Sequence, residues 1–396
     1  MKIGIFSPDV RPESGGASSL LKTIQKDIKT SLDENNDYCF LYFGEKSVSF
    51  SEFDGFKYVN LNSYSCKTSI KQKMKNKILR ALNLPTKEFS NFDAAAKDLG
   101  IDLFWFTAPG IYNVSYPYIY TVWDLGHRRT PYFPEVSRSG WIWEKREETY
   151  QKMFYKASYI ITGNEEGKKE ILENYPVPTG KIRIATFPVA AFCHGNEEKP
   201  SFYVPEQFFF YPAQFWPHKN HICILDALVA LREKNNLKPV VFFTGADKGN
   251  KDYIKSKITE YKLENQVFIT GFLKDEELKY LYTHATAMIF ASLMGPNNMP
   301  PIESTFLACP VIITDLDGHK EQLGDTALYF NGYNHLELAE QMKLLLTDNN
   351  LRESIISKEK VLGKAFNEIN YFSCIRSIIN EFSLIRKTWG KDFVHL

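Results

Sequence analysis

The residues best suited to chemistry lie in positions 292–325, where an expected strand gives way to an expected helix. The loop that opens this segment contains Gly295, Asn297, Asn298 and Met299, and two consecutive prolines then start the helix. Proline suits this position because its missing N–H would have no partner there. Free backbone N–H groups at a helix start attract anions. The segment therefore predicts a binding site for a negatively charged group.

Glu303 follows the two prolines and is expected in the first turn of this helix. Its carboxylate could accept two hydrogen bonds, as from the cis-diol of a ribose. Alternatively, Glu303 simply complements the positive end of the helix dipole. Composition alone favours this second interpretation.

A second candidate loop, Tyr211–His221, also follows an expected strand and precedes a helix. Lys219 in this loop could reach phosphates as a mobile point charge. The alternative is a solvated lysine at a helix start, which is the commoner role of such a residue.

The third candidate loop is Thr121–Glu135, where Asp124 and His127 leave a strand end close together, followed by Arg128 and Arg129. Either Asp124 or His127 could orient a hydroxyl group or accept a proton. The alternative is a turn with a capping aspartate and a surface histidine. A catalytic role requires that this loop faces a ligand.

The fourth candidate is the pair Gly15–Gly16, in the loop after the first expected strand. Two glycines let the backbone approach a ligand closely. The pattern is not G-x-G-x-x-G, so it does not indicate dinucleotide binding, and a tight turn explains it nearly as well.

These loops are embedded in short apolar runs that alternate with amphipathic helices. This pattern is typical of an α/β protein with parallel sheets covered on both faces. The first series of expected strands is Lys2–Phe6, Tyr38–Phe43, Leu103–Thr107, Tyr118–Val122, Tyr159–Thr162 and Ile182–Ala185, with helices at Glu144–Lys156 and Glu165–Asn174. The second series is Phe208–Pro212, Val240–Thr244, Val267–Thr270, Met288–Ala291 and Val311–Thr314, with helices at Asn220–Glu233 and Asp275–His284.

A polar stretch with two prolines, His194–Glu206, separates the two series and is interpreted as a linker. We therefore expect two Rossmann-like domains, residues 1–195 and 206–370. The last helix, within residues 371–396, is expected to pack back on the first domain. Open α/β sheets bind ligands at the carboxyl ends of their strands, so the candidate loops of both domains should meet in one cleft.

The overall composition is consistent with two globular domains and gives no indication of a nucleic-acid partner. The chain has 396 residues, of which 44% are hydrophobic and 24% charged, the range of a globular protein with two domains. A formal net charge of +1 gives no general attraction to nucleic acid. We find no apolar run of about 18 residues, no signal-peptide pattern and six scattered cysteines, which favour a cytoplasmic protein without zinc.

The candidate segments, in this order, resemble glycosyltransferase family 4, the retaining group 1 enzymes with the GT-B architecture. The likeness is densest between Phe209 and Phe330 and includes "FFFYPAQFWPHKNH" and "MPPIESTFLACPVIITDLDGHKEQLGDTALYF", together with "WDLGHRRTPYFPE" in the first domain. The resemblance implies an acceptor-binding first domain and a nucleotide-sugar-binding second domain that face each other across a cleft.

The resemblance also implies roles for single residues. Glu303 matches the second glutamate of the family signature and would bind the donor ribose, whereas Gly295 stands where the first glutamate normally contacts the transferred sugar. Lys219 matches the lysine of the phosphate-binding pair, and Gln214 stands at its arginine. Trp123 replaces a histidine that the family often carries before Asp124.

The resemblance implies transfer of a sugar from a nucleotide diphosphate to a saccharide or lipid-linked saccharide, with retention, in surface polysaccharide synthesis. Without a metal or other cofactor, Lys219 and the N–H groups after Gly295 would neutralise the leaving group. The expected catalytic residues are Asp124, His127 and Lys219. The expected donor-binding residues are Gly15, Gly16, Gln214, Lys219, Gly295, Asn297, Asn298, Met299 and Glu303.

Three further points remain open at this stage. The triplet Asp315-Leu316-Asp317 fits the Asp-x-Asp letters of metal-dependent transferases but is interpreted as a strand-to-helix loop. The basic stretch Lys67–Arg80 either contacts an anionic membrane surface or is a solvated helix. A nucleotide-sugar epimerase or hydrolase and a non-catalytic binding subunit are the alternative functions.

Overall fold

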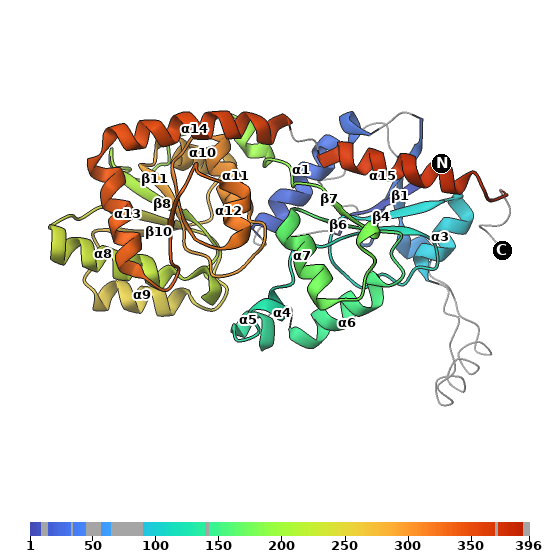
Figure 1. Cartoon of the computed structure of the whole chain (residues 1–396), viewed down its shortest axis with the longest axis horizontal. Coiled ribbons are helices and arrows are strands. Elements are labelled where there is room, and N and C mark those ends of the chain that lie inside the picture. Colours follow the sequence, from blue (N-terminus) through green and yellow to red (C-terminus); the bar gives the residue numbers. More distant parts are fainter. Residues whose placement is uncertain are drawn as a thin grey trace.

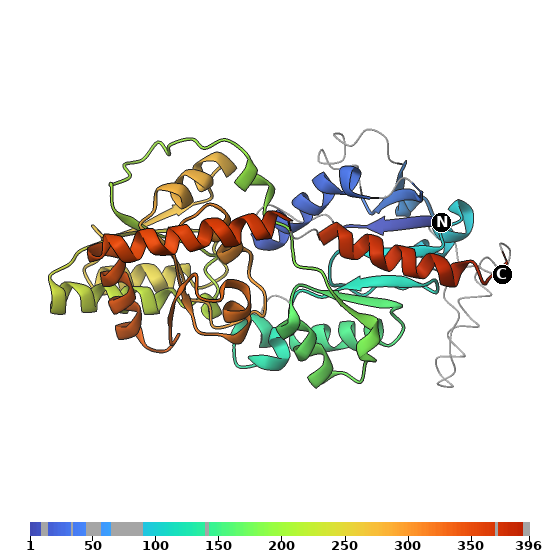
Figure 2. The same ribbon diagram turned by 45° about the horizontal axis from the view of Figure 1, so that its top comes forward.

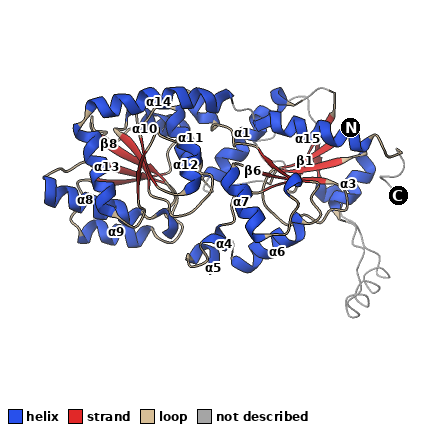
Figure 3. Cartoon of the chain, in the orientation of Figure 1, coloured by secondary structure: helices blue, strands red, loops and turns tan. Residues whose placement is uncertain are grey.

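A computed structural model describes residues 1–8, 15–32, 35–44, 57–64, 90–138, 142–368 and 371–390 of the chain. Two α/β domains lie side by side, with their sheets enclosed between helices (Figure 1, Figure 3). The basic stretch Lys67–Arg80 lies outside the described residues, so membrane contact through it stays a prediction. Within the described residues, we find no helix both long and apolar enough to cross a bilayer.

The N-terminal domain is built on a seven-stranded parallel sheet with the order β3-β2-β1-β4-β5-β6-β7. Its strands are β1 Lys2–Phe6, β2 Asp37–Tyr42, β3 Lys57–Asn60, β4 Leu103–Phe106, β5 Tyr118–Thr121, β6 Tyr159–Thr162 and β7 Ile182–Ile184. Its helices are α1 Gly16–Ser31, α3 Asn91–Leu99, α4 Gly126–Arg129, α5 Pro134–Ser137, α6 Trp143–Phe154 and α7 Glu165–Asn174.

The C-terminal domain is built on a six-stranded parallel sheet with the order β10-β9-β8-β11-β12-β13. Its strands are β8 Phe208–Pro212, β9 Val240–Thr244, β10 Val267–Gly271, β11 Ala287–Phe290, β12 Val311–Thr314 and β13 Leu328–Phe330. The helices that follow in the chain are α8 His221–Asn235, α9 Lys251–Glu260, α10 Asp275–His284, α11 Met299–Phe306, α12 Asp317–Leu323, α13 His335–Thr347, α14 Asn349–Glu368 and α15 Tyr371–Arg386.

The sequence of β4 explains why this sheet is covered on both faces. Its four residues, Leu-Phe-Trp-Phe, are all buried. Successive side chains point to opposite faces of a strand. Leu103 and Trp105 therefore join one apolar cluster, and Phe104 and Phe106 join the cluster on the other face. A strand that is apolar at every position can be stable only between two layers of helices.

The chain crosses back to the N-terminal domain at its end. Helix α14 runs along the C-terminal domain, and α15 then lies along the N-terminal domain (Figure 2). Helix α15 contributes Tyr371, Ile375 and Ile379 to the same apolar cluster as Trp105 of β4. An ion pair between Arg386 and Asp102 of 2.6 Å holds its end. The last helix therefore ties the two domains together.

The order of the strands determines where loops converge. In each sheet the first strand in the chain, β1 or β8, lies in the interior, with later strands added on both sides. Loops after neighbouring strands then run in opposite directions at this point, which opens a crevice at the carboxyl edge. The candidate loops follow β1 and β5 in one domain and β8 and β11 in the other.

The predicted fold class, two Rossmann-like units with parallel sheets, is confirmed. Strands β1, β6, β8, β9 and β12 and helices α7 and α10 have the predicted bounds, and most other elements shift by one or two residues. Two short strands were not predicted: β3 carries a single buried residue, Val59, and β13 has only three residues. Both are edge strands with one buried residue each, so burial leaves little pattern in their sequences.

One local prediction is wrong. Helix α11 begins at Met299 with Asn298 as its N-cap, so Pro300 and Pro301 occupy its second and third positions. Glu303 consequently lies in the second turn rather than the first. The cause is that Met299 already adopts helical geometry, ahead of the prolines.

Candidate functional site

A cavity of about 340 Å³ lies between the two domains. Its wall combines the start of α1 and residue Trp123 from the N-terminal domain with loops after β8, β9, β10 and β11 from the C-terminal domain. Eight of the predicted site residues line it: Gly15, Gly16, Gln214, Lys219, Asn297, Asn298, Met299 and Glu303. Three others, Asp124, His127 and Gly295, are not part of its lining.

Lys219 brings a positive charge to the wall of the cavity, and no carboxylate of the described residues is in contact with it. Its amine donates to Ser292 Oγ at 3.3 Å and to Asn298 Oδ1 at 3.5 Å, and it lies 4.8 Å from the centre of the Phe290 ring. Burial lowers the pKa of Lys219 to about 8. At neutral pH the amine is therefore a charged donor surrounded by neutral groups.

The groups around Lys219 explain why it keeps this charge. Burial lowers the pKa of His218, His221 and His319 to about 4, 3 and 4, so all three are neutral at pH 7. Asp124 and Glu135 of the N-terminal domain act in the opposite direction and favour the ammonium form of Lys219. The positive charge of one domain is thus supported electrostatically by carboxylates of the other.

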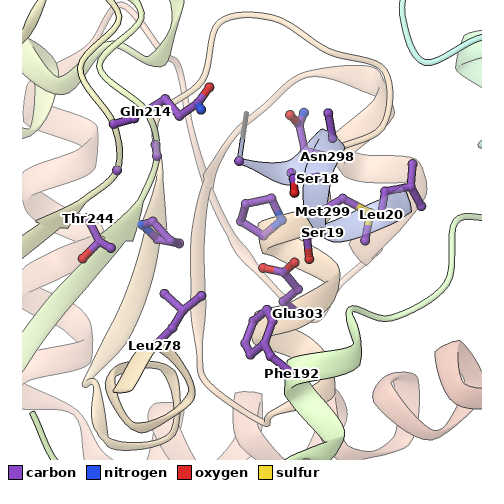
Figure 4. A pocket seen from close by; sticks show the side chains of 18 of the residues that line it. Ser18, Ser19, Leu20, Phe192, Gln214, Thr244, Leu278, Asn298, Met299 and Glu303 are labelled. Carbon is purple, nitrogen blue, oxygen red and sulfur yellow. The ribbon is translucent and has the colours of Figure 1, made fainter. Parts of the chain in front are cut away.

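Glu303 places a buried carboxyl group in the same cavity. Its side chain is directed into the space, on the same side as Ser18 and Ser19 of α1, while Gln214 and Thr244 lie across it (Figure 4). Glu303 Oε2 accepts a hydrogen bond from the Tyr282 hydroxyl at 2.8 Å. Burial raises the pKa of Glu303 to about 7 although this hydrogen bond opposes the shift. Such a carboxyl changes its charge state near neutral pH.

The loop before α11 is shaped by a network of amides. Asn298 Nδ2 donates to His319 Nε2 at 3.0 Å, and the backbone N–H of Asn298 donates to Gln322 Oε1 at 3.3 Å. Gly295 has a φ of +113°, and a Cβ there would lie 2.8 Å from Asn298 Nδ2. Gly295 therefore shapes the loop, while Asn297 and Asn298 face the cavity.

This helix start offers fewer backbone donors than the sequence predicted. Pro300 and Pro301 have no N–H, and the N–H of Asn298 is used by Gln322. Helix α1, which begins beside it at the cavity after Gly15, is a second source of donors: within the described residues, no side-chain hydrogen bond caps its N-terminus. More of the positive charge must consequently come from Lys219 and α1.

The two glycines at the start of α1 lie against the C-terminal domain. Gly15 has a φ of +62°, and a Cβ there would lie 3.0 Å from Gln214 Nε2. Gly16 faces the Met299 side chain, with 3.9 Å between its hypothetical Cβ and Met299 Cγ. Glycine at position 15 thus meets two demands, a left-handed backbone and the close approach of Gln214.

Asp124 lies next to the cavity but its carboxylate is already bound. Asp124 Oδ1 accepts from the Gly126 N–H and from Arg146 Nη1, both at 2.7 Å. Burial alone would raise the pKa of Asp124, but Arg146 and the Gly126 N–H hold it below its usual value. Asp124 is therefore ionised at neutral pH and fixed by the N-terminal domain.

The structure does not bring His127 to the cavity. The residue has no exposed surface, and its ring contacts Glu147 Oε2 at 3.3 Å and the Tyr175 hydroxyl at 3.4 Å. Burial lowers its pKa to about 4. The alternative prediction of a surface histidine is wrong, because α4 turns the ring inward onto Tyr150.

The sequence analysis did not single out several residues that line the cavity or contact its lining. The Tyr282 partner of Glu303 lies on another helix, so no local spacing reveals it. Gly245 could have been recognised, because a glycine directly after a strand often marks a place where another segment of backbone comes close. A Cβ at position 245 would lie 2.4 Å from the Ala213 carbonyl oxygen. Lys22 and Asp275 also line the cavity and had no distinguishing pattern.

Asp315 follows β12 directly and Asp317 is the first residue of α12, in agreement with the interpretation as a strand-to-helix connection. Among the residues that the structure describes, no group of three or more His, Cys, Asp or Glu side chains is arranged to hold a metal ion.

Comparison with known proteins begins with the C-terminal domain. Residues 196–361 match the family described as Glycosyl transferases group 1. This range contains the loops that carry Lys219, Asn298 and Glu303.

Curated relatives extend the likeness. The chain is 25% identical over 220 residues to N-acetylgalactosamine-N,N'-diacetylbacillosaminyl-diphospho-undecaprenol 4-alpha-N-acetylgalactosaminyltransferase of Campylobacter jejuni, covering 55% of this chain and 58% of that protein. It is 26% identical over 181 residues to the O-antigen chain mannosyltransferase RfbU of Salmonella typhimurium, covering 44% and 47%. The chain thus spans about half the length of these relatives.

Solved structures match both domains. Sucrose-phosphate synthase from Thermosynechococcus elongatus superimposes with a TM-score of 0.70 at 14% identity, covering 98% of this chain and 100% of that chain. Anabaena HepE in complex with UDP-glucose gives a TM-score of 0.65 at 15% identity, covering 97% and 99%. At these identities the comparison establishes a shared fold.

Proposed function

We propose that the protein is a glycosyltransferase of surface polysaccharide synthesis, because its C-terminal domain belongs to the group 1 glycosyltransferases and the whole chain has the GT-B fold. The donor is a nucleoside diphosphate sugar, and the acceptor is a saccharide or a lipid-linked saccharide. The names of the Campylobacter and Salmonella relatives support both classes of acceptor.

The observation that carries this proposal is the pair of ionisable groups in the interdomain cavity. Lys219 presents an ammonium group and Glu303 a carboxyl group to the same space, and among the described residues neither has an oppositely charged partner in contact. Departure of a nucleoside diphosphate builds negative charge on its β-phosphate. Lys219, assisted by the first N–H groups of α1, is placed to neutralise that charge.

Glu303 is suited to the nucleoside part of the donor. A buried carboxylate whose second oxygen is not taken by Tyr282 can accept hydrogen bonds from the two hydroxyls of a ribose. Its ionised form would then be stabilised by the donor, which compensates for the burial that raises its pKa.

We further propose that the reaction retains configuration and needs no metal ion. The acceptor hydroxyl would attack from the face on which the diphosphate leaves, with Asp124 fixed at the margin of the acceptor side. The counter-charge that a metal would provide is assigned to Lys219. A chelator should therefore leave the transfer rate unchanged, and an NMR spectrum of the product should show the anomeric configuration of the donor.

The first test is a donor screen by thermal shift with UDP-, GDP- and dTDP-sugars. Specific binding stabilises a protein by about 2.7 kcal/mol at a ligand concentration 100 times Kd. We expect one nucleotide class to raise the unfolding temperature in the wild type and much less in Lys219→Met.

The second test offers lipid-linked saccharide acceptors together with the donor that binds. Transfer to an acceptor supports the proposal. Turnover of the donor in the absence of any acceptor would favour an epimerase or hydrolase, and binding without turnover would favour a non-catalytic subunit.

A further inference from the structure

A buried contact joins the N-terminal domain to the turn that carries Lys219. Glu135, in α5, is 5% exposed and lies against His218 of the C-terminal domain. Glu135 Oε1 accepts from the backbone N–H of His218 at 3.0 Å and also forms a hydrogen bond with His218 Nδ1. One carboxylate oxygen thus holds both the main chain and the side chain of the same residue.

His218 is the residue immediately before Lys219, within the single turn of 3₁₀ helix Pro217–Lys219. The N–H groups at the start of such a turn have no partner inside it, and the Glu135 carboxylate supplies one. On the other side, the His218 carbonyl oxygen accepts from the Leu293 N–H at 2.8 Å. His218 therefore connects Glu135 to the loop that follows β11.

The protonation states fit this role. Burial lowers the pKa of His218 to about 4, so its ring is neutral and must carry its proton on Nδ1 to donate to Glu135. Burial alone would raise the pKa of Glu135, but the two donors of His218 hold it below its usual value. The contact is a charge-assisted hydrogen bond between a carboxylate and a neutral imidazole.

We propose that Glu135 is a positioning residue for transfer: from the N-terminal domain it fixes the turn that presents Lys219 to the donor diphosphate. Because its partner belongs to the other domain, the contact exists only while the domains are together around the cavity. The position of Lys219 therefore depends on the contact between the two domains. This inference rests on the proposed function, since it assigns Lys219 to the diphosphate.

Another interdomain contact provides a matched control. The Glu321 carboxylate, from α12, accepts from the N–H groups of Glu165 and Glu166 at 2.7 and 2.8 Å. It also joins the two domains through one acidic side chain and two donors. It does not touch the turn of Lys219, so Glu321→Ala removes an interdomain contact without the positioning that we assign to Glu135.

The experiment compares Glu135→Ala, Glu135→Gln and Glu321→Ala with the wild type in kcat and in KM for the donor. In Glu135→Ala we expect kcat to fall on the order of tenfold, the scale of one lost charge-assisted hydrogen bond, with a smaller change in KM. Glu321→Ala should reduce kcat less than about twofold. Equal losses of kcat in these two alanine variants would overturn the inference.

Two further variants separate positioning from general stability. His218→Asn keeps a donor near the place of Nδ1 and should retain most of the wild-type kcat, whereas His218→Leu should lose as much as Glu135→Ala. If His218→Asn and His218→Leu are equally impaired, the side-chain contact does not position Lys219.

The pH profile gives a readout that stability alone would not move. The charged and titratable groups that influence Lys219 or are influenced by it are Asp124, Glu135, His218, His221 and His319. Glu135→Gln removes a negative charge that favours the ammonium form, so the alkaline limb of kcat/KM should move to lower pH. An unmoved limb would contradict the coupling. A wild type without any transfer would instead reject the proposed function.

Discussion

Two polar clusters differ in how their charged side chains are paired: one lies in the N-terminal domain, outside the lining of the cavity, and the other lies in the cavity wall. In the N-terminal domain, Glu147 accepts from Arg128 Nε at 2.8 Å and from the Tyr175 hydroxyl at 2.9 Å, and Asp124 pairs with Arg146 at 2.7 Å. In the C-terminal domain, the hydrogen bonds of Lys219 within the described residues go to the neutral Ser292 and Asn298, and that of Glu303 comes from the Tyr282 hydroxyl.

This difference indicates where a ligand belongs. A buried charge is costly unless it is paired, so the paired cluster already has the interactions that stabilise it in the folded chain. Burial shifts the pKa values of Lys219 and Glu303 toward their neutral forms, and under the proposed function the bound donor would supply partners for both charges. We therefore regard the N-terminal cluster as a support and the C-terminal pair as the binding groups.

The largest effect should come from removing the ammonium group. Lys219→Met keeps the apolar stem and deletes the charge, and we expect kcat/KM to fall by about 10²–10³, as when one donor to a developing anion is lost. The measurement is steady-state transfer, with Lys255→Met on α9 as a control for loss of a surface lysine. A loss of less than threefold would remove the distinction between the two clusters.

Glu303→Gln should have the next largest effect. An amide is nearly the same shape as the carboxyl but loses the charge that strengthens hydrogen bonds to a diol, so donor affinity should fall on the order of tenfold to a hundredfold. Titration with the nucleoside diphosphate and with its 2'-deoxy analogue measures this. If the variant and the wild type discriminate equally between the two nucleotides, Glu303 does not bind the ribose.

The pH dependence of kcat/KM should show two limbs of about tenfold per pH unit. Glu303, with a pKa raised to about 7, becomes a carboxylate as pH rises through 7, and Lys219, with a pKa lowered to about 8, loses its charge above 8. We therefore expect a maximum between pH 7 and 8.

Glu170 is a second buried carboxyl group with a raised pKa, and it provides a control for this test. Burial and the nearby Asp124 raise its pKa to about 7 as well, although it belongs to the N-terminal side, where the Leu125 N–H donates to it at 3.3 Å. Glu303→Gln should abolish the acid limb and Glu170→Gln should leave it. The reverse outcome would move the titrating group to the N-terminal cluster.

How far the sequence could predict this molecule depends on whether a feature is formed by residues close together in the chain. In the C-terminal domain, β8, β9 and β12 are compact apolar runs, so their bounds and the loops after them could be read directly. Because the cavity lies where such loops converge, Lys219, Asn298 and Glu303 could be named as candidates from their positions near strand ends, and the family resemblance then favoured binding roles for them. This part depends on chain-local patterns.

Contacts between segments that lie far apart in the chain could not be predicted from the sequence. The hydrogen bonds of Tyr282 to Glu303 and of Glu135 to His218 join residues 21 and 83 positions apart. The inward turn of His127 depends on Glu147, which lies on a different helix. Spacing along one chain contains no information about such pairs, so His127 could be placed only by tertiary structure.

The smallest effect on transfer should come from that buried histidine. His127→Phe keeps the stacking on Tyr150 and loses the contacts with Glu147 and Tyr175. We expect about 1 kcal/mol less stability, the scale of one buried hydrogen bond, and a change of less than about threefold in kcat/KM. Thermal unfolding and steady-state transfer measure the two quantities on the same preparation. A hundredfold loss of kcat at an unchanged unfolding temperature would mean that His127 reaches the substrate, and the N-terminal cluster would then be catalytic rather than a support.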